Sequence, residues 1–333
     1  MHNTPEYYVA PMEGVTDIHF RKLHHSFFPE ADRYYSPFLS PSEERLLTPK
    51  ELAEIDPMAN EGMVLIPQLL TNRWDLFVGA AGQLASMGYP LVNLNLGCPS
   101  GTVVSKKRGA GFLSDPEGLD RFFYQVFSAP TADSFRVSVK TRLGVHDPEE
   151  FYRLAEIYVS YPFEEIILHP RTKDQMYSGK ALPDFYELLR KKVQELPDGR
   201  QKPRLVMNGD LFTCSLAEEF DRTVGADDAL MFGRGLIANP ALIRQMKGGA
   251  GLTKQEMKEF AQTVYARTRE IMNGSERNTL FAMKEYWYYW SRLFSPSDKA
   301  VKPIRKAQRL TDYESAVRNV FAAFEFRPES VTF

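Results

Sequence analysis

Eight short apolar segments alternate with helical segments over most of the chain, and this alternation most narrows the possible folds. The segments have the length and apolar content of buried strands, and several end at Gly, Pro or Asn. The predicted strands are 7–12, 32–37, 63–70, 91–96, 136–143, 165–169, 204–208 and 228–232. Helices are expected at 18–27, 73–87, 115–127, 148–161, 184–196 and 215–223, with a loop and short helix at 42–53. Eight strands with intervening helices over about 240 residues predict an α/β protein of the (β/α)8 barrel (TIM barrel) class.

A doubly wound open sheet is the alternative architecture. Such a sheet, when it binds a dinucleotide, carries a Gly-x-Gly-x-x-Gly motif after its first strand. The segment that follows residue 12 has no such motif. The barrel is therefore favoured, with residues 1–245 as one catalytic domain.

The pattern changes beyond residue 245, where the strand-like segments stop. The glycine-rich segment 248–251 reads as a flexible joint. Thr253 followed by Glu256 is a capping-box pattern, which begins a long helix over 253–272. Further helices are expected at 278–293, 298–310 and 312–324, so residues 252–333 are predicted to form a small all-helical domain. The aromatic residues of 278–293 are expected to lie mostly in its core.

Composition excludes several classes of protein. A hydrophobic content of 43% and a charged content of 25% are ordinary for a globular protein. The two cysteines, Cys98 and Cys214, cannot form a disulfide framework and favour a reducing, cytoplasmic setting. The first residues lack the basic start and apolar core of a signal peptide. No apolar run approaches the roughly 20 residues of a membrane span.

The charge is distributed unevenly along the chain. The net charge is −2, but residues 241–333 contain 16 Lys and Arg against 10 Asp and Glu. Residues 1–240 contain 25 basic and 33 acidic residues. A basic C-terminal region indicates a docking surface for a polyanion, and ordinary scatter of surface charge is the competing interpretation.

The carboxyl ends of the predicted strands carry the chemically useful side chains. In a (β/α)8 barrel these ends converge on one mouth. The residues placed there are Pro11, Met12, Ser36, Gln68, Asn95, Cys98, Lys140, Arg142, His169, Arg171, Asn208, Asp210, Gly233 and Arg234. Together they predict a mouth lined with hydrogen-bond donors, cations and one thiol, without a metal site. Glycines follow the last two strands, where many barrels bind phosphate, so a phosphate-bearing cofactor is expected.

Cys98 follows directly after the predicted strand 91–96, in the sequence Asn95-Leu96-Gly97-Cys98-Pro99. A lone cysteine at a strand end is more often a buried structural residue than a reactive one. The polar groups at the other strand ends favour the reactive interpretation here.

Six segments of the chain resemble the motif series of the tRNA-dihydrouridine synthases. They are Ala10-Pro11-Met12-Glu13-Gly14-Val15-Thr16-Asp17, Asn93-Leu94-Asn95-Leu96-Gly97-Cys98-Pro99, Val139-Lys140-Thr141-Arg142-Leu143-Gly144, His169-Pro170-Arg171-Thr172, Asn208-Gly209-Asp210 and Gly233-Arg234-Gly235-Leu236-Ile237-Ala238-Asn239-Pro240. One such segment alone is a weak signal, but the ordered set is highly specific and spans most of residues 7–240. The C-terminal part resembles that family's RNA-binding helical domain more loosely.

The resemblance implies an FMN-dependent oxidoreductase that reduces specific uridines of tRNA to 5,6-dihydrouridine. FMN would be reduced by NADPH (or NADH) and would pass hydride from N5 to C6 of the uridine. Cys98 would then protonate C5, a role that suits a thiol with a reference pKa of about 8.5. Asn95 would bind the pyrimidine edge, and Lys140 would lie against flavin N1/O2 and stabilise the reduced flavin.

The remaining site residues follow from the same resemblance. Pro11, Met12 and Gln68 would contact the isoalloxazine ring. The ribityl and phosphate end would be held by Asn208, Asp210, Gly233 and Arg234. His169 is assigned to the cofactor and Arg171 to the substrate, although both are also suited to the other role.

The substrate uridine must leave its stack to reach a flavin in the barrel mouth, so a flipped base is expected. The candidate tRNA surface consists of cations of the C-terminal region: Lys284, Arg292, Lys299, Lys302, Arg305, Lys306 and Arg309. No membrane contact and no obligate protein partner are predicted.

Two departures from the family pattern leave the target uridine open. Ser36-Pro37 stands where the family often has an acidic residue after Ser or Thr, and the loop after Cys98 has a dense basic patch at 105–108. The competing functions are an FMN-barrel oxidoreductase acting on rRNA or on a free pyrimidine or small enone, and an RNA-binding protein without catalysis.

Overall fold

The computed structural model describes residues 5–224 and 229–333. The described chain divides into two compact units. The first contains residues 33–210 with the segments 5–13 and 229–231, and the second contains 14–32, 211–223 and 232–333. The boundary predicted between residues 245 and 252 stays a prediction.

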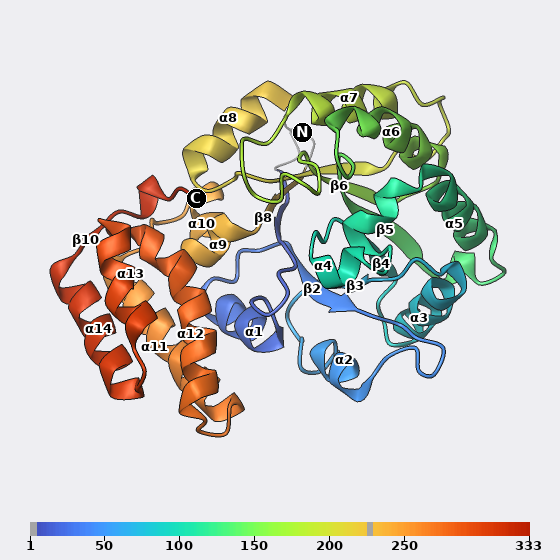
Figure 1. Ribbon diagram of the computed structural model, residues 1–333. Coiled ribbons are helices and arrows are strands. Elements are labelled where there is room, and N and C mark those ends of the chain that lie inside the picture. The colour runs from blue at the N-terminus through green and yellow to red at the C-terminus, as the bar shows by residue number, and fades with distance from the viewer. Residues whose placement is uncertain (1–4, 225–228) are drawn as a thin grey trace. The chain divides into compact units, whose positions relative to one another are not determined.

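The first unit is built on eight parallel strands that close into a barrel in sequence order (Figure 1). The strands are β1 (Tyr7–Val9), β2 (Arg33–Leu39), β3 (Leu65–Leu69), β4 (Leu91–Leu96), β5 (Arg136–Arg142), β6 (Glu165–His169), β7 (Arg204–Asn208) and β8 (Ala229–Phe232). This confirms the predicted (β/α)8 barrel. The open-sheet alternative is wrong because the sheet has no edges.

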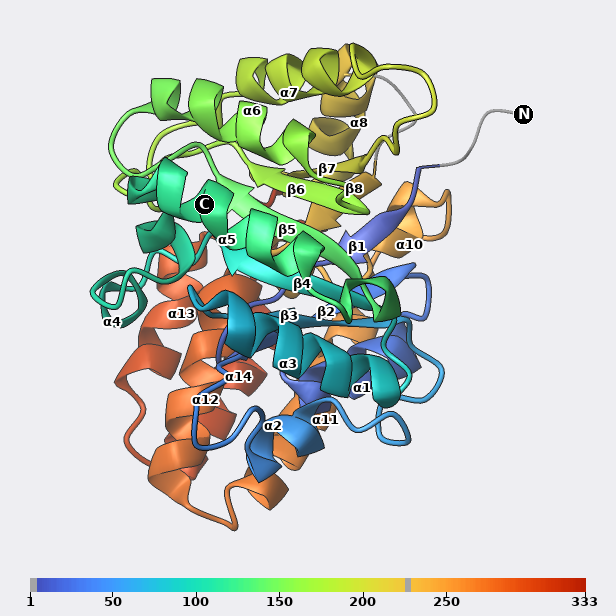
Figure 2. The ribbon, with the colours of Figure 1, turned by 90° about the vertical axis from the view of Figure 1, so that its right-hand side faces the viewer.

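Helices follow the strands of this unit as the sequence pattern predicts. They are α2 (Pro49–Glu54), α3 (Trp74–Ser86), α4 (Gly101–Val104), α5 (Pro116–Ser128), α6 (Phe151–Ser160) and α7 (Asp184–Gln194). Figure 2 shows α3, α5, α6 and α7 following one another along the outside of the sheet. α5 begins where predicted because Asp115 accepts a hydrogen bond from the Gly118 N–H and Pro116 occupies the first turn.

The ends of β1 and β2 differ from the prediction. β1 stops at Val9, before Pro11, whose ring nitrogen cannot donate to a ladder. β2 continues through Pro37 to Leu39, because the ladder to β3 shifts register between Tyr35 and Phe38. At this irregularity Ser36 Oγ accepts a hydrogen bond from the Gln68 N–H at 3.1 Å. Ser36-Pro37 therefore lies inside a strand, and the predicted strand end there is wrong. Residue 228, the predicted start of the last strand, lies outside the described residues.

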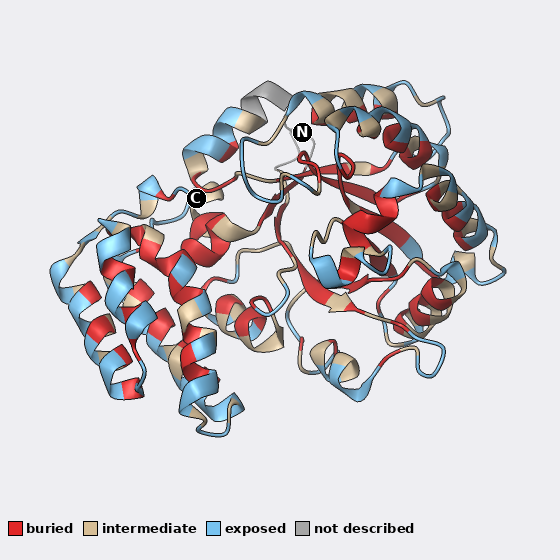
Figure 3. Cartoon of the chain, in the orientation of Figure 1, coloured by how far each residue is buried: buried red, intermediate tan, exposed pale blue. Residues whose placement is uncertain are grey.

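The barrel interior changes in character from the amino to the carboxyl ends of its strands. At the amino ends Glu165, only 1% exposed, accepts hydrogen bonds from Arg33 (2.5 Å), Tyr35 (2.5 Å) and Tyr8 (3.1 Å). Apolar side chains fill the next part: Ala10, Ile66, Leu91, Ile167, Val206, Ala229 and Met231. Polar side chains follow at the carboxyl ends. Figure 3 shows the strands largely buried, so the barrel is a packed core with its polar groups at the two ends.

The second unit is helical. Its elements are α1 (Ile18–Phe27), α8 (Cys214–Val224), α9 (Arg234–Ala238), α10 (Leu242–Met246), α11 (Lys254–Ile271), α12 (Glu276–Trp290), α13 (Ser297–Lys306), α14 (Leu310–Ala323) and the two-residue strands β9 (Phe294–Ser295) and β10 (Glu325–Phe326). The predicted capping box of α11 is confirmed, since Thr253 and Glu256 each bond the backbone of the other. The helical character of residues 252–333 is also confirmed, with the short β9–β10 pair added.

Most of the aromatic residues of α12 lie in the core of the second unit, as predicted, whereas Phe281 and Tyr288 are exposed. Tyr286, Trp287, Tyr289 and Trp290 are at most 8% exposed. Tyr286 stacks on Phe20 of α1 with ring centroids 5.8 Å apart, and its hydroxyl donates to the Val15 carbonyl at 3.0 Å. In the described part of the chain, no helix is long and apolar enough to span a membrane.

Candidate active site

The turn after β4 places the Cys98 thiol. Asn95 Oδ1 accepts hydrogen bonds from two backbone N–H groups, that of Gly97 at 3.1 Å and that of Cys98 at 2.9 Å. The Cys98 carbonyl in turn accepts from the Ala110 N–H at 3.0 Å. Both sides of the cysteine are therefore fixed by hydrogen bonds, and the predicted loop that follows contains a helical turn (α4) and a 3-10 segment, Gly109–Ser114.

A chain of buried side-chain hydrogen bonds orients Asn95. Asn95 Nδ2 donates to Gln68 Oε1 at 2.7 Å, and Gln68 Nε2 donates to Asn93 Oδ1 at 2.7 Å. Asn93 Nδ2 completes the chain by donating to Ser138 Oγ at 2.8 Å. These side chains are at most 8% exposed. Each amide therefore has a defined orientation, and Gln68 supports Asn95 directly.

The Cys98 thiol is free and half-buried. Burial raises the pKa of Cys98 above its ordinary value of 9.0; a backbone hydrogen bond from Ser100 opposes this shift, and the charge of Glu13 adds to it. The thiol therefore holds its proton at neutral pH. That state suits a proton donor and not a nucleophile or metal ligand, which must be thiolates.

Lys140 lies on β5, the strand beside β4, which carries Asn95. The register of β4 and β5 pairs the two residues directly. Burial, aided by the nearby Arg142 charge, lowers the pKa of Lys140 to about 7. The ammonium group has no hydrogen-bond or ion-pair partner within residues 5–224 and 229–333. A half-buried cation without a partner is unfavourable, so this position is suited to an anionic or electron-rich ligand group.

We expect Lys140→Met to stabilise the protein without a bound ligand. The pKa of Lys140 is about 7 in the folded chain and near 10.5 when exposed, so only the unfolded chain binds this proton between those pH values. The cost of burying the ammonium is therefore full below pH 7 and disappears as the pH rises to 10.5. Thermal unfolding should show a Tm gain of about 2–4 °C for the variant at pH 6.5, the shift that about 1 kcal/mol gives. A gain that is equal at pH 6.5 and pH 10 would contradict this assignment.

Arg142 is a second cation at the carboxyl end of β5, but its hydrogen bonds go to carbonyl groups of the surrounding loops. Its guanidinium donates to the carbonyls of Gly97 (2.8 Å), Thr172 (3.0 Å) and Met176 (2.8 Å). Burial lowers the pKa of Arg142 to about 10, so it stays charged at neutral pH. Arg142 therefore joins the Cys98 turn to the loop after β6.

His169 at the end of β6 is held by Arg171. The Arg171 guanidinium donates to His169 Nε2 at 3.0 Å, and to Asp210 Oδ2 and the Gly179 carbonyl at 2.6 Å each. Because a guanidinium only donates, Nε2 must accept, and the ring proton of His169 lies on Nδ1. Arg171 is 1% exposed, so in this structure it positions His169 and Asp210. Its predicted contact with substrate stays a prediction.

The end of β7 approaches His169 closely. Gly209 has φ +125°, and a Cβ there would lie 2.7 Å from His169 Cδ2, so only glycine fits. Asn208 Nδ2 donates to the Met231 carbonyl at 2.8 Å. Asp210 has φ +54° and accepts a second hydrogen bond from the Ala181 N–H at 3.0 Å.

The structure brings most of the predicted site residues of the first unit to one end of one barrel. Pro11 and Met12 follow β1 and are half-buried. Three predicted residues lie in the second unit and are described there alone: Gly233 precedes α9, Arg234 stacks on Phe212 at 4.9 Å, and Lys284 donates to the Ala307 carbonyl at 2.7 Å.

Sequence reasoning missed several supporting residues. Asn93 and Ser138 were not among the predicted site residues, although Asn93 lies two residues before Asn95 and therefore on the same face of its strand. Tyr177 was also missed. Its ring is 52% exposed, lies 5.5 Å from the Arg142 guanidinium and has its centroid 6.2 Å from that of His169. Nothing in the sequence of its loop signals this approach.

A family model described as dihydrouridine synthase matches residues 8–321. The chain belongs to the dihydrouridine synthase family. The expected resemblance is confirmed, and it covers both the barrel and the helical region.

Relatives of this dihydrouridine synthase family member are named as probable tRNA-dihydrouridine synthases. One from Rickettsia conorii is 28% identical over 323 residues, which cover 95% of this chain and 92% of the relative. One from Rickettsia typhi is 30% identical over 72% of this chain and 69% of the relative. A third, from Synechocystis, is 29% identical over 72% of this chain, and the match spans less than two thirds (63%) of that relative.

Solved structures share the barrel. Morphinone reductase in complex with tetrahydroNAD is 15% identical, with a TM-score of 0.51 over 75% of this chain and 88% of that chain. A 2-naphthoyl-CoA reductase is 11% identical, with a TM-score of 0.53 over 74% of this chain and 50% of that chain. At such identities the likeness concerns the fold alone. Within the described residues of this dihydrouridine synthase family member, no three His, Cys, Asp or Glu side chains are grouped as metal ligands.

Proposed function

We propose that this chain is an FMN-dependent tRNA-dihydrouridine synthase that uses NADPH as reductant. The single observation that carries the proposal is the pair formed by Cys98 and Lys140. A thiol that keeps its proton and an ammonium without a partner lie at the carboxyl ends of adjacent strands of one barrel. The family match and the names of the relatives support the same activity.

The groups present fit a flavin. Lys140 offers a cation without a partner, and Arg171 fixes the orientation of the His169 ring. We assign Lys140 to the N1/O2 edge of the ring and Pro11, Met12 and Gln68 to the rest of it. His169, Asn208 and Asp210 are assigned to the ribityl and phosphate end, and the roles expected for Gly233 and Arg234 in the second unit stay predictions. When bound, the flavin supplies the hydride that is added to C6 of the uracil ring.

Cys98 supplies the second hydrogen of the product. Its Sγ–H bond breaks, the proton forms the new C–H bond at C5, and the resulting thiolate takes a proton from water afterwards. Asn95 binds the uracil edge. Since Asn95 Oδ1 already accepts two backbone N–H groups, its contribution to the base is the remaining Nδ2 hydrogen, which suits a carbonyl oxygen.

The exposed face of α13 is the proposed tRNA contact of the helical region. Lys302, Arg305 and Lys306 line a surface hollow of about 500 Å³, together with Asp298. Cations at spacings of three and four residues lie on one side of a helix, where they suit a row of phosphates. Lys284 is less suited to this task because it already bonds the Ala307 carbonyl.

The purified protein should be yellow, and acid extraction should release FMN. Incubation with NADPH and an unmodified tRNA transcript should add the mass of two hydrogens per reacting uridine, read by mass spectrometry of nuclease fragments. Reduction of rRNA or of free uridine nucleotides without reduction of tRNA would favour the alternative oxidoreductases. A colourless protein that does not bind FMN would contradict the proposal.

A further inference from the structure

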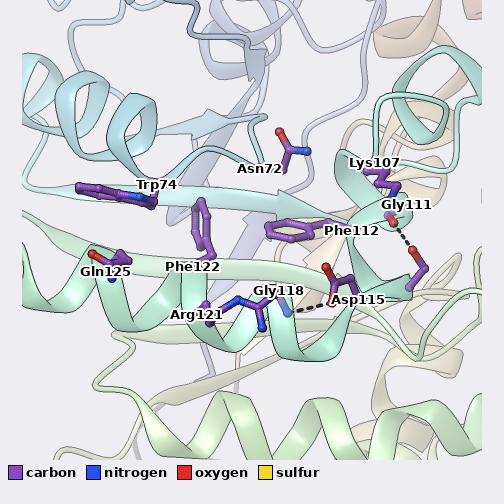
Figure 4. Close-up of a pocket in the computed structure, with 11 residues that line it drawn as sticks. Asn72, Trp74, Lys107, Gly111, Phe112, Asp115, Gly118, Arg121, Phe122 and Gln125 are labelled. Carbon is purple, nitrogen blue, oxygen red and sulfur yellow. Dashed lines mark hydrogen bonds between the residues drawn. The ribbon is translucent and has the colours of Figure 1, made fainter.

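A second pocket lies outside the barrel, in the first unit, with a volume of about 430 Å³. It is lined by the start of α3, the segment after α4 and the first turns of α5, which all follow the carboxyl ends of β3 and β4. Figure 4 shows Trp74 and Gln125 at one end, Lys107 and Gly111 at the other, and Arg121 along one side. By its place in the topology, the pocket lies on the rim of the barrel on the side of Cys98.

The floor of this pocket is aromatic and its edges are cationic. Phe112 and Phe122 are buried and pack edge to face with ring centroids 5.5 Å apart. Trp74 is 41% exposed, and its indole makes no hydrogen bond or ring contact with any described residue. An exposed indole beside a buried aromatic floor is a stacking surface for a planar ring.

The cations of the pocket are available to an anion. The side chains of Lys107 and Arg121 have no hydrogen-bond or ion-pair partner among the residues that the structure describes. Asp75 already pairs with Arg73 at 2.6 Å, whereas Asp115, which lines the pocket and accepts from the Gly118 N–H at 2.9 Å, keeps its negative charge. The pocket therefore combines one stacking ring with two cations and one carboxylate, which leaves a positive excess.

The pocket shares a segment with the thiol. The Ala110 N–H bonds the Cys98 carbonyl, and a Cβ on Gly109 would lie 3.1 Å from Cys98 Cβ. Lys107 and Gly111, on either side of these two residues, line the pocket. A ligand held there contacts the same short stretch of backbone that fixes Cys98.

We propose that this pocket binds an unpaired nucleotide of the RNA substrate, close in the RNA to the uridine that reacts. Its base stacks on Trp74, and its phosphates contact Lys107 and Arg121. The proposal rests on the proposed function. RNA is favoured over a small nucleotide because the exposed Lys106 continues the positive charge beyond the pocket, which matches a continuing phosphate backbone.

Acrylamide quenching of tryptophan fluorescence in the holoenzyme tests the stacking directly. Of the three tryptophans, Trp287 and Trp290 are fully buried, so Trp74 accounts for the accessible emission. Saturation with an unmodified tRNA transcript should remove that accessible fraction, and Trp74→Phe should lack it from the start. Tight tRNA binding that leaves Trp74 accessible would overturn the pocket assignment but not the proposed function. Protection by NADPH without RNA would identify a dinucleotide site instead and would also overturn it.

Substitutions test the same contacts by affinity. Trp74→Ala should weaken tRNA binding about tenfold or more. Lys107→Ala and Arg121→Ala should each lower the slope of log Kd against log salt by about 0.7–0.9. Reduction of the bound flavin by NADPH should not change. The matched controls are Tyr124→Ala on α5, 61% exposed and outside the pocket, and Lys191→Ala on α7.

Unchanged affinity and salt slope in all three pocket variants would overturn the proposal. If the wild-type holoenzyme neither binds nor reduces tRNA, the proposed function fails with it. Equal losses in the control variants would show that the effect belongs to the whole surface and not to the pocket.

Discussion

Cys98→Ala should slow uridine reduction by about 10²- to 10⁴-fold, the range that a general acid contributes. The alanine removes the proton donor and leaves the backbone bonds of the turn to Asn95 and Ala110 in place. We therefore expect flavin content, bleaching of the flavin absorbance by NADPH and tRNA affinity to match the wild type. The loss should appear in single-turnover measurements, where dihydrouridine formation is followed by mass spectrometry.

The pH profile separates an acid from a structural residue. A donor works only while protonated, and burial raises the pKa of Cys98 above 9.0. The wild-type rate should therefore be flat through neutral pH and fall only above about pH 9. Near-wild-type turnover by Cys98→Ala, or a profile that falls already between pH 6 and 8, would show that another group delivers the proton.

Glu165→Ala should destabilise the barrel by about 3–5 kcal/mol, the usual cost of removing one partner of a buried ion pair. Glu165 is 1% exposed and accepts from Arg33, Tyr35 and Tyr8. Its loss leaves a half-buried guanidinium and two buried hydroxyls without this acceptor. In thermal unfolding we expect Tm to fall by roughly 10 °C.

The adjacent residue provides the control. Glu164 pairs with Arg136 at 2.8 Å on the surface, so Glu164→Ala should cost less than about 1 kcal/mol. Replacing both Glu165 and Arg33 by methionine should recover part of the stability, since no unpaired charge then remains. A loss for Glu165→Ala as small as that for Glu164→Ala would mean that this buried cluster does not stabilise the barrel.

The alternation of strands and helices was sufficient to predict the barrel and nearly all its elements. β4, β6, β7 and α1 have the predicted bounds because Gly, Pro or Asn ends each apolar run or because the local periodicity is regular. The errors occur where tertiary contacts override local signals. Pro37 suggests the end of a strand, but β2 continues beyond it. The register shift against β3 and the hydrogen bond between the Gln68 N–H and Ser36 Oγ accommodate the proline.

The candidate site was predictable in its residues but not in their roles. Strand ends can be read from the sequence, so Cys98, Asn95 and Lys140 could be placed together. Pairings between side chains far apart in sequence cannot be read in this way. Arg142 and Arg171 were expected to be cations of an open mouth, yet both are buried and bond loop carbonyls or, for Arg171, also His169 and Asp210. The pocket at the barrel rim could not be predicted from the sequence for the same reason, because its lining residues come from three separate segments.

The hydrogen-bond chain from Ser138 to Asn95 has a direction, and this limits which hydrogen bonds Asn95 can make to a base. Every amide in it donates toward Ser138, and both lone pairs of the Asn95 oxygen are taken by backbone N–H groups. Asn95 can therefore still donate one hydrogen bond through Nδ2, but it cannot accept another. A pyrimidine carbonyl can accept the remaining Asn95 Nδ2 hydrogen. The exocyclic amino group of cytosine is itself a donor, so it cannot form a hydrogen bond with that group. With Asn95 at the base, as proposed, we expect uracil to be preferred over cytosine, partly because Gln68, Asn93 and Ser138 fix the orientation of Asn95.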